Sequence, residues 1–296
     1  IGGGWTNNAL GDYSVITGGK DNTATADYSV VVGGRLNTGQ HTASTVAGGQ
    51  SNSATGQYSV VGGGLYNTAS KTLSTVIGGY YNNAGYRGVV GGGWANSASS
   101  LYASIGGGRQ NMATAPYAIV AGGFLNTAGT AYSAVSGGYA NRAQSSFSVV
   151  SGGRNNTASH NYAAVGGGLF NQARASASVI GGGYYNTNDA LRGVIGGGST
   201  NNALGDYSVI TGGKDNTASA DYSAITGGLE NLANAEYGSV SGGRTNNASA
   251  SFTTIGGGNS NTANGVYSTI AGGQDNTDGG SAATVAGGHS NRATGA

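Results

Sequence analysis

The sequence predicts an all-β protein, a parallel β-solenoid (β-roll) of about 20 coils with about 15 residues per coil. Three observations predict this fold. An asparagine recurs at a constant interval from Asn7 and Asn22 onward, a Gly-Gly pair stands at a fixed offset before each asparagine, and Val or Ile stands six residues before it. Self-similarity at a fixed period is the signature of a repeat architecture, in which each unit packs only on its neighbours.

The repeat unit is Gly-Gly-x-x-Asn-x-Ala, and it occurs 20 times. The step between successive asparagines is constant except from Asn82 to Asn96, where it is one residue shorter, so one coil has lost a residue between positions 85 and 90. Three coils lack alanine two residues after the asparagine, and they carry instead Gly39, Asn188 and Asp278. The first eight fixed asparagines are Asn7, Asn22, Asn37, Asn52, Asn67, Asn82, Asn96 and Asn111.

Two short strands and two corners are expected in each coil. A helix is excluded, because each glycine in a helix interior costs about 1 kcal/mol and the apolar spacing has no helical period. The run Tyr-Ser-Val-Ile at 13–16 is aromatic and β-branched and is bounded by glycines, which predicts a strand. Asn-x-Ala is expected to begin a second strand with smaller side chains. Gly-Gly then supplies a corner where φ can be positive and where no Cβ obstructs the next coil.

The alternation along the first strand assigns its two faces. Ser14 and Ile16 share one side, and Tyr13 and Val15 share the other. The Ser/Ala and Val/Ile rows are predicted inside the solenoid, together with Ala9 and its equivalents. The fixed asparagines are predicted at a corner as a structural ladder, each amide bonding to the amides one coil above and below and to free backbone groups.

The position six residues after the asparagine is aromatic in 13 of 19 complete coils. A strand that is apolar on both faces is normally covered on both faces. Ordering one coil costs on the order of 15–30 kcal/mol, while one buried Val or Ile returns roughly 2 kcal/mol. A single thin solenoid therefore buries too little apolar surface to offset this cost, which predicts a homo-oligomer whose chains pack through their aromatic faces. This oligomer face includes Tyr13, Tyr28, Tyr58, Tyr102, Tyr117, Tyr132, Tyr207 and Tyr222.

Repeats such as YSVITGGKDNTATADYSVVVGG resemble the head repeats of trimeric autotransporter adhesins (YadA-like) and the glycine-asparagine repeats of phage-type and bacterial tail fibres. The resemblance covers the whole chain. It implies left-handed parallel β-rolls around a three-fold axis, a homotrimer, surface display, and attachment to cells or matrix. The repeat of the adhesin heads is usually one residue shorter and has an Ala-Ile-Gly centre, whereas the repeat of this chain has a fixed asparagine.

Catalytic, cofactor and metal sites are not predicted anywhere in the chain. His41 and His160 lie eight coils apart and His289 lies further still, so no histidine cluster is expected within one chain. Gly18-Gly19-Lys20 is followed by Asp21, with no Ser/Thr and no helix, so it is not a phosphate loop. The formal net charge of +1 argues against nucleic acid as a partner, and the lack of cysteine excludes thiolate catalysis and disulfides. No apolar run is long enough for a membrane span.

Segments of the chain have been copied in register. Residues 1–24 match 195–218 at 23 of 24 positions, which preserves a rod and changes only its length. The sequence begins and ends inside a repeat, so residues 1–296 are expected to form one continuous solenoid domain that is a window on a longer repetitive chain.

The predicted function is that of a non-enzymatic extracellular or cell-surface fibre segment, a rod-like adhesin head or stalk. Two alternatives stay open, a self-assembling structural filament and an ice- or polysaccharide-binding solenoid; the ice alternative rests on the threonines that follow the asparagine in 9 of 20 units. Besides sister chains, the candidate partners are cell-surface glycans, matrix and neighbouring filaments. The candidate partner-binding aromatics, in the corner between Gly-Gly and Asn, include Trp5, Tyr66, Tyr80, Tyr81, Trp94, Phe124, Tyr184 and Tyr185.

Overall fold

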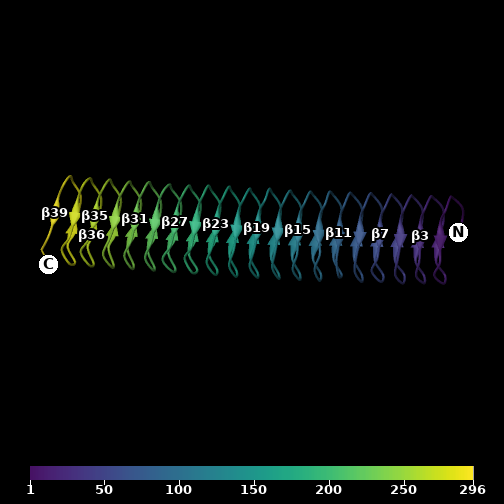
Figure 1. Ribbon diagram of the computed structural model, residues 1–296. Helices are drawn as coiled ribbons and strands as arrows, with labels where there is room; N and C mark the ends of the chain where they lie inside the picture. The colour runs from purple at the N-terminus through teal and green to yellow at the C-terminus, as the bar shows by residue number, and fades with distance from the viewer. Residues whose placement is uncertain (296) are drawn as a thin grey trace. The chain divides into compact units, whose positions relative to one another are not determined.

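The computed structural model describes residues 1–295 and divides into two compact units, Ile1–Phe147 and Ser148–Ala296. Each unit is a parallel β-solenoid with a repeat of about 15 residues per turn, as the sequence predicts, and no helix occurs among the described residues (Figure 1). The regular strands are only two residues long.

The odd-numbered strands follow the repeat asparagine, and within each unit successive odd strands pair in parallel, as Asn8 does with Thr23. In the first unit they are β1 (Asn8–Ala9), β3 (Thr23–Ala24), β5 (Thr38–Gly39), β7 (Ser53–Ala54), β9 (Thr68–Ala69), β11 (Asn83–Ala84), β13 (Ser97–Ala98), β15 (Met112–Ala113), β17 (Thr127–Ala128) and β19 (Arg142–Ala143). In the second unit they are β21 (Thr157–Ala158), β23 (Gln172–Ala173), β25 (Thr187–Asn188), β27 (Asn202–Ala203), β29 (Thr217–Ala218), β31 (Leu232–Ala233), β33 (Asn247–Ala248), β35 (Thr262–Ala263), β37 (Thr277–Asp278) and β39 (Arg292–Ala293).

The even-numbered strands carry the Val/Ile row and form a second parallel ladder, in which Ile16 pairs with Val31. In the first unit they are β2 (Val15–Ile16), β4 (Val30–Val31), β6 (Thr45–Val46), β8 (Val60–Val61), β10 (Thr75–Val76), β12 (Val89–Val90), β14 (Ser104–Ile105), β16 (Ile119–Val120) and β18 (Ala134–Val135). In the second unit they are β20 (Val149–Val150), β22 (Ala164–Val165), β24 (Val179–Ile180), β26 (Val194–Ile195), β28 (Val209–Ile210), β30 (Ala224–Ile225), β32 (Ser239–Val240), β34 (Thr254–Ile255), β36 (Thr269–Ile270) and β38 (Thr284–Val285).

A third ladder, which the sequence did not predict, runs along the corner after Gly-Gly. It contributes one residue per turn, and Trp5, Lys20 and Arg35 are bridged in parallel in this way. The backbone N–H of Trp5 donates to the carbonyl oxygen of Gly19 in the next turn at 2.9 Å. A turn of the solenoid therefore has three β segments, where two strands and two corners were expected.

The second glycine of each pair is required by both conformation and space. Gly19 has a φ of 94°, and a Cβ there would lie 2.2 Å from the carbonyl oxygen of Gly34 in the next turn. The first glycine of that pair, Gly18, has no such constraint, since a Cβ there would meet no atom within 4 Å. Tight stacking of the turns thus depends on the glycine that immediately precedes the third ladder.

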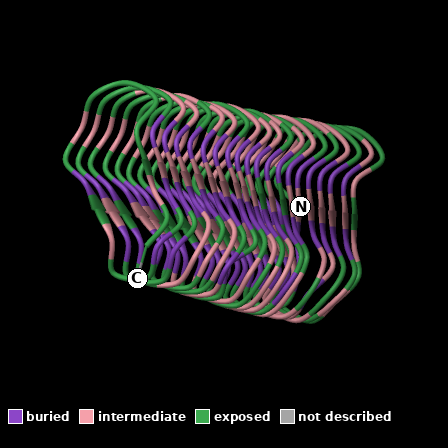
Figure 2. Ribbon diagram, turned by 90° about the vertical axis from the view of Figure 1, so that its left-hand side faces the viewer, coloured by how far each residue is buried: buried purple, intermediate pink, exposed green. Residues whose placement is uncertain are grey.

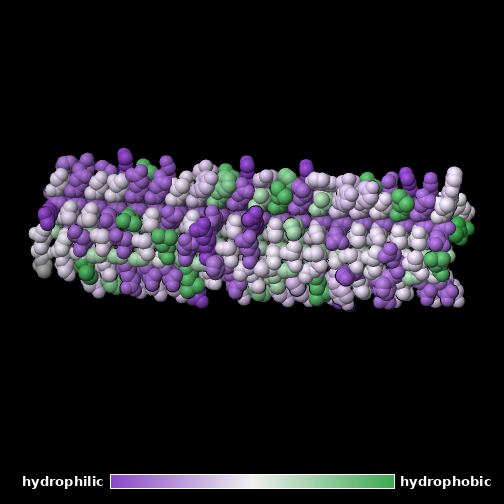
Figure 3. All heavy atoms as spheres, viewed as in Figure 1, coloured by the Kyte–Doolittle hydropathy of each residue, from purple (hydrophilic) through white to green (hydrophobic). Residues whose placement is uncertain are grey.

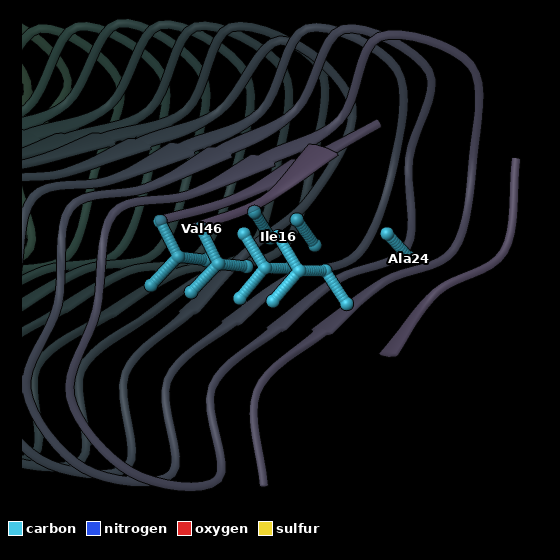
Figure 4. Packing of buried hydrophobic residues seen from close by; sticks show 7 residues of the cluster. Ile16, Ala24 and Val46 are labelled. Carbon is cyan, nitrogen blue, oxygen red and sulfur yellow. The ribbon is translucent and has the colours of Figure 1, made fainter. Parts of the chain in front are cut away.

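The interior is a thin apolar core formed by the facing ladders. Ile16, Val31 and Ala24 are fully buried, and the Val/Ile row faces the alanines that follow the asparagines (Figure 4). Buried positions line the inside of the turns while the corners are exposed (Figure 2). Ser29 is also fully buried, which confirms the predicted placement of the Ser/Ala row inside the solenoid.

The shortened coil keeps both of its strands in register. Thr75 of β10 pairs with Val89 of β12, and Val89 pairs in turn with Ser104 of β14. The missing residue falls in the connection from β11 to β12, within the segment that the sequence indicated. Because the loss lies in an outer turn, the core positions of this coil are preserved, with Ala84 and Val90 fully buried.

Two polar side chains replace the interior alanine in the second unit, and both are fully buried. Asn188 donates through Nδ2 to the carbonyl oxygens of Val179 at 3.0 Å and Gly193 at 2.7 Å, and its Oδ1 accepts from the N–H of Ala190 at 3.2 Å. By contrast, both carboxyl oxygens of Asp278 are buried without a hydrogen-bond partner of normal geometry.

Candidate functional site

The asparagine column consists of the fixed asparagines of the repeat. The backbone N–H of Asn22 donates to Oδ1 of Asn7 at 3.0 Å, while Nδ2 of Asn22 donates to the carbonyl oxygens of Gly18 at 3.1 Å and Gly34 at 2.9 Å. These contacts link three successive turns and lie away from the outer surface, since Asn22 is fully buried.

The same pattern of carbonyl contacts recurs at Asn37 and at Asn111. The expected amide-to-amide hydrogen bond is present only in some turns, such as Asn22 to Asn7 at 3.1 Å and Asn276 to Asn261 at 3.0 Å. The column therefore holds the turns mainly through side chain-to-backbone bonds. This geometry satisfies the glycine carbonyls at the corner and offers no group to a ligand.

The tyrosine column consists of the aromatic residues six positions after the asparagine. The prediction that these residues lie within a strand is wrong, because Tyr13 and Tyr28 have φ values of 58°, in the left-handed region. The strand β2 begins only at Val15. The physical reason is a tight turn, in which the N–H of Ser14 donates to the carbonyl oxygen of Gly11 at 3.1 Å.

The rings of this column stack on one another along the direction in which the turns repeat. Tyr13 and Tyr28 have ring centroids 5.1 Å apart with an interplanar angle of 10°, and Tyr117 and Tyr132 are 4.9 Å apart at 2°. Each ring face is thus covered by the next ring, and the edges point outward. Tyr13 is 77% exposed and Tyr117 is 40% exposed. Offset or parallel stacking of this kind contributes about 0.5–1.5 kcal/mol per pair beyond burial.

Two stretches of the tyrosine column share the same order, and we call them phenol blocks. The first block is Tyr102, Tyr117 and Tyr132, and the second is Tyr207, Tyr222 and Tyr237. Each block is preceded by an arginine in the column and followed by a phenylalanine. These residues are Arg87 and Phe147 for the first block, and Arg192 and Phe252 for the second.

The two arginines make contacts in this column that the sequence did not predict. Arg192 donates through Nη1 to the hydroxyl of Tyr207 at 2.7 Å, and its guanidinium lies 5.5 Å from the centre of that ring. Arg87 makes the same hydrogen bond to the hydroxyl of Tyr102. The available signal was their position, since each arginine occupies the column site one turn before a tyrosine.

Exposed aliphatic side chains adjoin the tyrosine column on the outward face of the even strands. Val15, Ile119 and Val209 are 42%, 49% and 38% exposed, whereas their strand neighbours Ile16, Val120 and Ile210 are buried. The strand is therefore apolar on both faces, as the sequence predicts, and one of these faces is uncovered in the single chain. Figure 3 shows one face of the molecule, where apolar side chains stand in groups among polar ones.

The corner aromatics pack mainly against each other and against cations. Tyr66 stacks on Tyr81 at 4.8 Å, and Tyr80 meets Tyr81 edge-on at 4.5 Å. In the same way Tyr184 meets Tyr185 edge-on at 4.5 Å. Stacking on a sugar needs a free ring face, and several faces in these groups are already occupied.

Cationic side chains cover further ring faces in the corner row. The Arg109 guanidinium lies 4.0 Å from the ring centre of Trp94 and 5.0 Å from that of Phe124, while Nζ of Lys20 lies 5.2 Å from the ring centre of Trp5. Such pairs contribute about 0.5–1 kcal/mol at exposed sites. The structure thus brings the predicted corner aromatics into separate clusters with their neighbours in the row.

Acidic side chains near the tyrosine column bond to backbone groups. Oδ1 of Asp27 accepts from the N–H of Asp12 at 2.9 Å, and Oδ1 of Asp221 accepts from the N–H of Asp206 at 2.8 Å. Within residues 1–295, no group of three or more His, Cys, Asp or Glu side chains is arranged to hold a metal ion. The same stretch contains no helix with the length and apolarity needed to cross a membrane.

The threonines of the odd strands lie on the outward face and are half-buried, as Thr23 and Thr38 are. Met112 and Arg142 occupy the same row and are exposed, so the threonines do not form a continuous surface. Comparison of the sequence with protein-family models gives no match, and comparison with curated proteins gives none either.

Proposed function

We propose that the chain is a non-enzymatic segment of an extracellular fibre, a rod-like adhesin head or stalk in which three copies associate through their tyrosine columns. The observation that supports this proposal is the uncovered face of the even strands, where half-exposed phenol rings adjoin outward Val or Ile side chains in many turns, such as Val15, Ile119 and Val209. In other turns the same position holds a smaller or more polar side chain, such as Thr45 or Ser104. Large contiguous apolar surfaces on soluble proteins mark interaction sites.

The regular spacing of this face favours a second copy of the same chain as its partner. An identical chain presents ring edges at the same repeat distance, so the stacked stretches of the column from two chains can interdigitate. Closed symmetric assemblies are the common solution for such self-complementary surfaces. The three-fold arrangement and the left-handed coil rest on the resemblance to the adhesin heads, as do surface display and attachment to cells or matrix.

The proposal is tested by the oligomeric state of the purified chain. Light scattering coupled to size exclusion is expected to give a trimer for the natural sequence. Replacing Tyr102, Tyr117 and Tyr132 together by asparagine is expected to give monomers, and asparagine is chosen because it tolerates positive φ. The matched control replaces the corner aromatics Tyr66, Tyr80 and Tyr81 by asparagine and is expected to leave the trimer intact.

A monomeric natural chain, or a trimer that is lost only in the control, would contradict the proposal. Long filaments in electron micrographs that grow with protein concentration would instead favour the structural-filament alternative. Thermal hysteresis of the purified segment would favour the ice-binding alternative, and we expect none because the threonine row is interrupted.

A further inference from the structure

We propose that the two phenol blocks are sites of oxidative tyrosine coupling, at which a peroxidase-type oxidant with hydrogen peroxide joins the rings of successive turns by a carbon–carbon bond. The proposal concerns rings of a single chain, so it stands independently of the proposed fibre function.

The geometry places like phenols next to one another in direct contact. In the second block, Tyr222 lies between Tyr207 and Tyr237 with centroid distances of 5.0 Å on both sides and interplanar angles of 5° and 9°. In the first block the two distances are 5.1 Å and 4.9 Å. The rings are held at this spacing by the backbone ladder, so two oxidised neighbours meet without diffusion. Their half-exposed edges leave the side chains room to tilt until two ortho carbons touch.

The reaction balances with hydrogen peroxide as the electron acceptor. Each of two phenols loses one electron and its hydroxyl proton and becomes a phenoxyl radical. The radicals join through their ortho carbons, and each ring then returns its ortho hydrogen to its oxygen, which restores the phenol. Two electrons and two protons in total pass to one hydrogen peroxide molecule, giving two water molecules.

Carboxylates near Tyr222 can accept the hydroxyl proton that this tyrosine loses when it is oxidised. Desolvation and the neighbouring Tyr207 and Tyr237, together with Asp221 and Glu236, raise the pKa of the Tyr222 phenol above its usual value of 10.0. The phenol is therefore protonated at neutral pH, and its oxidation must release a proton. The charges of Asp221 and Glu236 act on this phenol, and either carboxylate can accept that proton.

The ends of each block limit how far coupling can extend. Phe147 and Phe252 continue the ring stack, but phenylalanine has no hydroxyl hydrogen to lose. At the opposite end, the guanidinium of Arg87 or Arg192 takes the place of a ring. The same order of side chains in both units marks each block as a unit of three oxidisable rings.

Coupling would give this chain a type of covalent link that it otherwise lacks. The sequence contains no cysteine, so no disulfide can join one turn to the next. A bond between Tyr207 and Tyr222 would close a loop of one turn and would hold two adjacent rungs together when their backbone hydrogen bonds open.

The chain contains a matched internal control for this chemistry. Tyr58 occupies the tyrosine column and has the same left-handed conformation, with a φ of 56°. The column positions one turn before and one turn after it hold Ala43 and Leu73, so Tyr58 has no phenol neighbour in the column. Tyr58 is 51% exposed, which makes it at least as accessible to an oxidant as Tyr222 at 45%.

The test treats the purified full chain with horseradish-type peroxidase and limiting hydrogen peroxide, followed by trypsin and mass spectrometry. Coupling in the second block is expected to join peptide 193–214 to peptide 215–244 with the loss of two hydrogens. Coupling in the first block is expected to join 88–109 to 110–142. Tyr58 in peptide 36–71 is expected to stay unlinked, as read from the fragment ions of that peptide. Tyr66 in the same peptide stacks on Tyr81 at 4.8 Å, so a link from Tyr66 to peptide 72–87 does not count as a link of Tyr58. Blue dityrosine fluorescence is expected to appear.

Tyr222→Phe provides the decisive variant, because phenylalanine already occurs in the column and keeps the stack. It is expected to abolish the link between 193–214 and 215–244 and to leave the first block unchanged, while Tyr58→Phe is expected to change neither. The proposal is overturned if no links form, if Tyr58 is linked as often as the blocks, or if links occur only between chains. A monomeric chain that still forms the expected links would contradict the proposed trimer and leave this inference standing.

Discussion

Asn188 and Asp278 occupy the same place in the repeat, two residues after the fixed asparagine. Both side chains are buried, but they differ in their hydrogen bonds. The Asn188 amide donates two hydrogen bonds and accepts one, whereas neither oxygen of Asp278 has a hydrogen-bond partner of normal geometry. Burial raises the pKa of the Asp278 carboxyl above its usual value of 3.8, and the nearby N–H groups of Gly280 and Thr269 lower it only in part.

The comparison shows what this interior requires of a polar side chain. The available partners at Asn188 are mainly carbonyl oxygens, so a side chain that donates is satisfied and a carboxylate is not. Room matters as well. Gly193 lies opposite Asn188, and a Cβ at that glycine would come within 2.6 Å of Oδ1 of Asn188. In other turns the same two positions hold a pair of alanines, such as Ala113 with Ala118.

The largest effect is expected for Asn188→Asp, which turns the satisfied site into a copy of the unsatisfied one. The new carboxylate would face the carbonyl oxygens of Val179 and Gly193, and an uncompensated buried charge costs on the order of 3–5 kcal/mol. Urea denaturation at neutral pH, followed by circular dichroism, is expected to show a loss of this size in the free energy of unfolding. Asn188→Ala serves as the control and is expected to cost less, since alanine is the usual residue here. Equal losses for both variants would contradict the importance of the charge.

A smaller effect is expected for Gly193→Ala. The added Cβ would lie 2.4 Å from Cβ of Ala190 and 2.6 Å from Oδ1 of Asn188, and such overpacking costs about 1–3 kcal/mol. Combining it with Asn188→Ala is expected to recover most of the loss, because the double variant recreates the alanine pair of other turns. A double-mutant cycle of thermal or urea unfolding measures this coupling. Additive losses would show that the two positions do not compete for space.

Asp278→Asn is expected to stabilise the protein by about 1–2 kcal/mol at neutral pH, since it replaces an unpartnered carboxylate by an uncharged amide with donors. The melting temperature of the second unit measures the gain. Asp275→Asn is the matched control, because Asp275 lies in the same turn and is exposed, and no gain is expected there. A lower melting temperature for Asp278→Asn would contradict the unsatisfied state of this carboxyl.

The smallest expected effect is the change with pH in the stability gained by Asp278→Asn. The folded-state pKa of Asp278 is raised, so below pH 3.8 both folded and unfolded states are protonated and the carboxyl carries no charge penalty. As the pH rises above 3.8, the unfolded state ionises first and the natural chain loses stability, until the pH passes the folded-state pKa. The advantage of Asp278→Asn in melting temperature is thus expected to be smallest in acid, below that value, and larger at neutral pH. A constant advantage across this range would exclude a titrating Asp278.

The solenoid could be predicted from the sequence because its signals recur in every turn. The buried rows of Ile16, Ala24 and Ser29 follow from the alternation of small and apolar residues around the glycine pair. The left-handed φ of Tyr13 could not be predicted in the same way, since a bulky aromatic residue is rarely found in that conformation. The third ladder was missed because a single bridging residue, such as Trp5 or Lys20, has no hydrophobic period of its own.

The candidate site was predictable in its positions and less so in its contacts. The tyrosine column and the corner aromatics were located by spacing, but spacing does not reveal that the rings stack face to face. The roles of Arg87 and Arg192 also depend on where the guanidinium lies relative to the next ring. Likewise, the asparagine amides bond mainly to glycine carbonyls rather than to one another, because those carbonyls lie within reach at the corner. The carbonyl oxygen of Gly34, for example, accepts from the Asn22 amide as well as from the backbone N–H of Lys20.

Each full turn carries two non-glycine residues in the left-handed conformation, Thr6 and Tyr13 being one such pair. A left-handed residue costs roughly 1–2 kcal/mol, which gives about 2–4 kcal/mol for each turn. That strain is offset only by the contacts with a neighbouring turn, so a single turn is not stable on its own. Folding is therefore expected to begin with slow nucleation at a few adjacent turns, followed by rapid addition of turns on either side. The outermost turns are expected to exchange their amide hydrogens first.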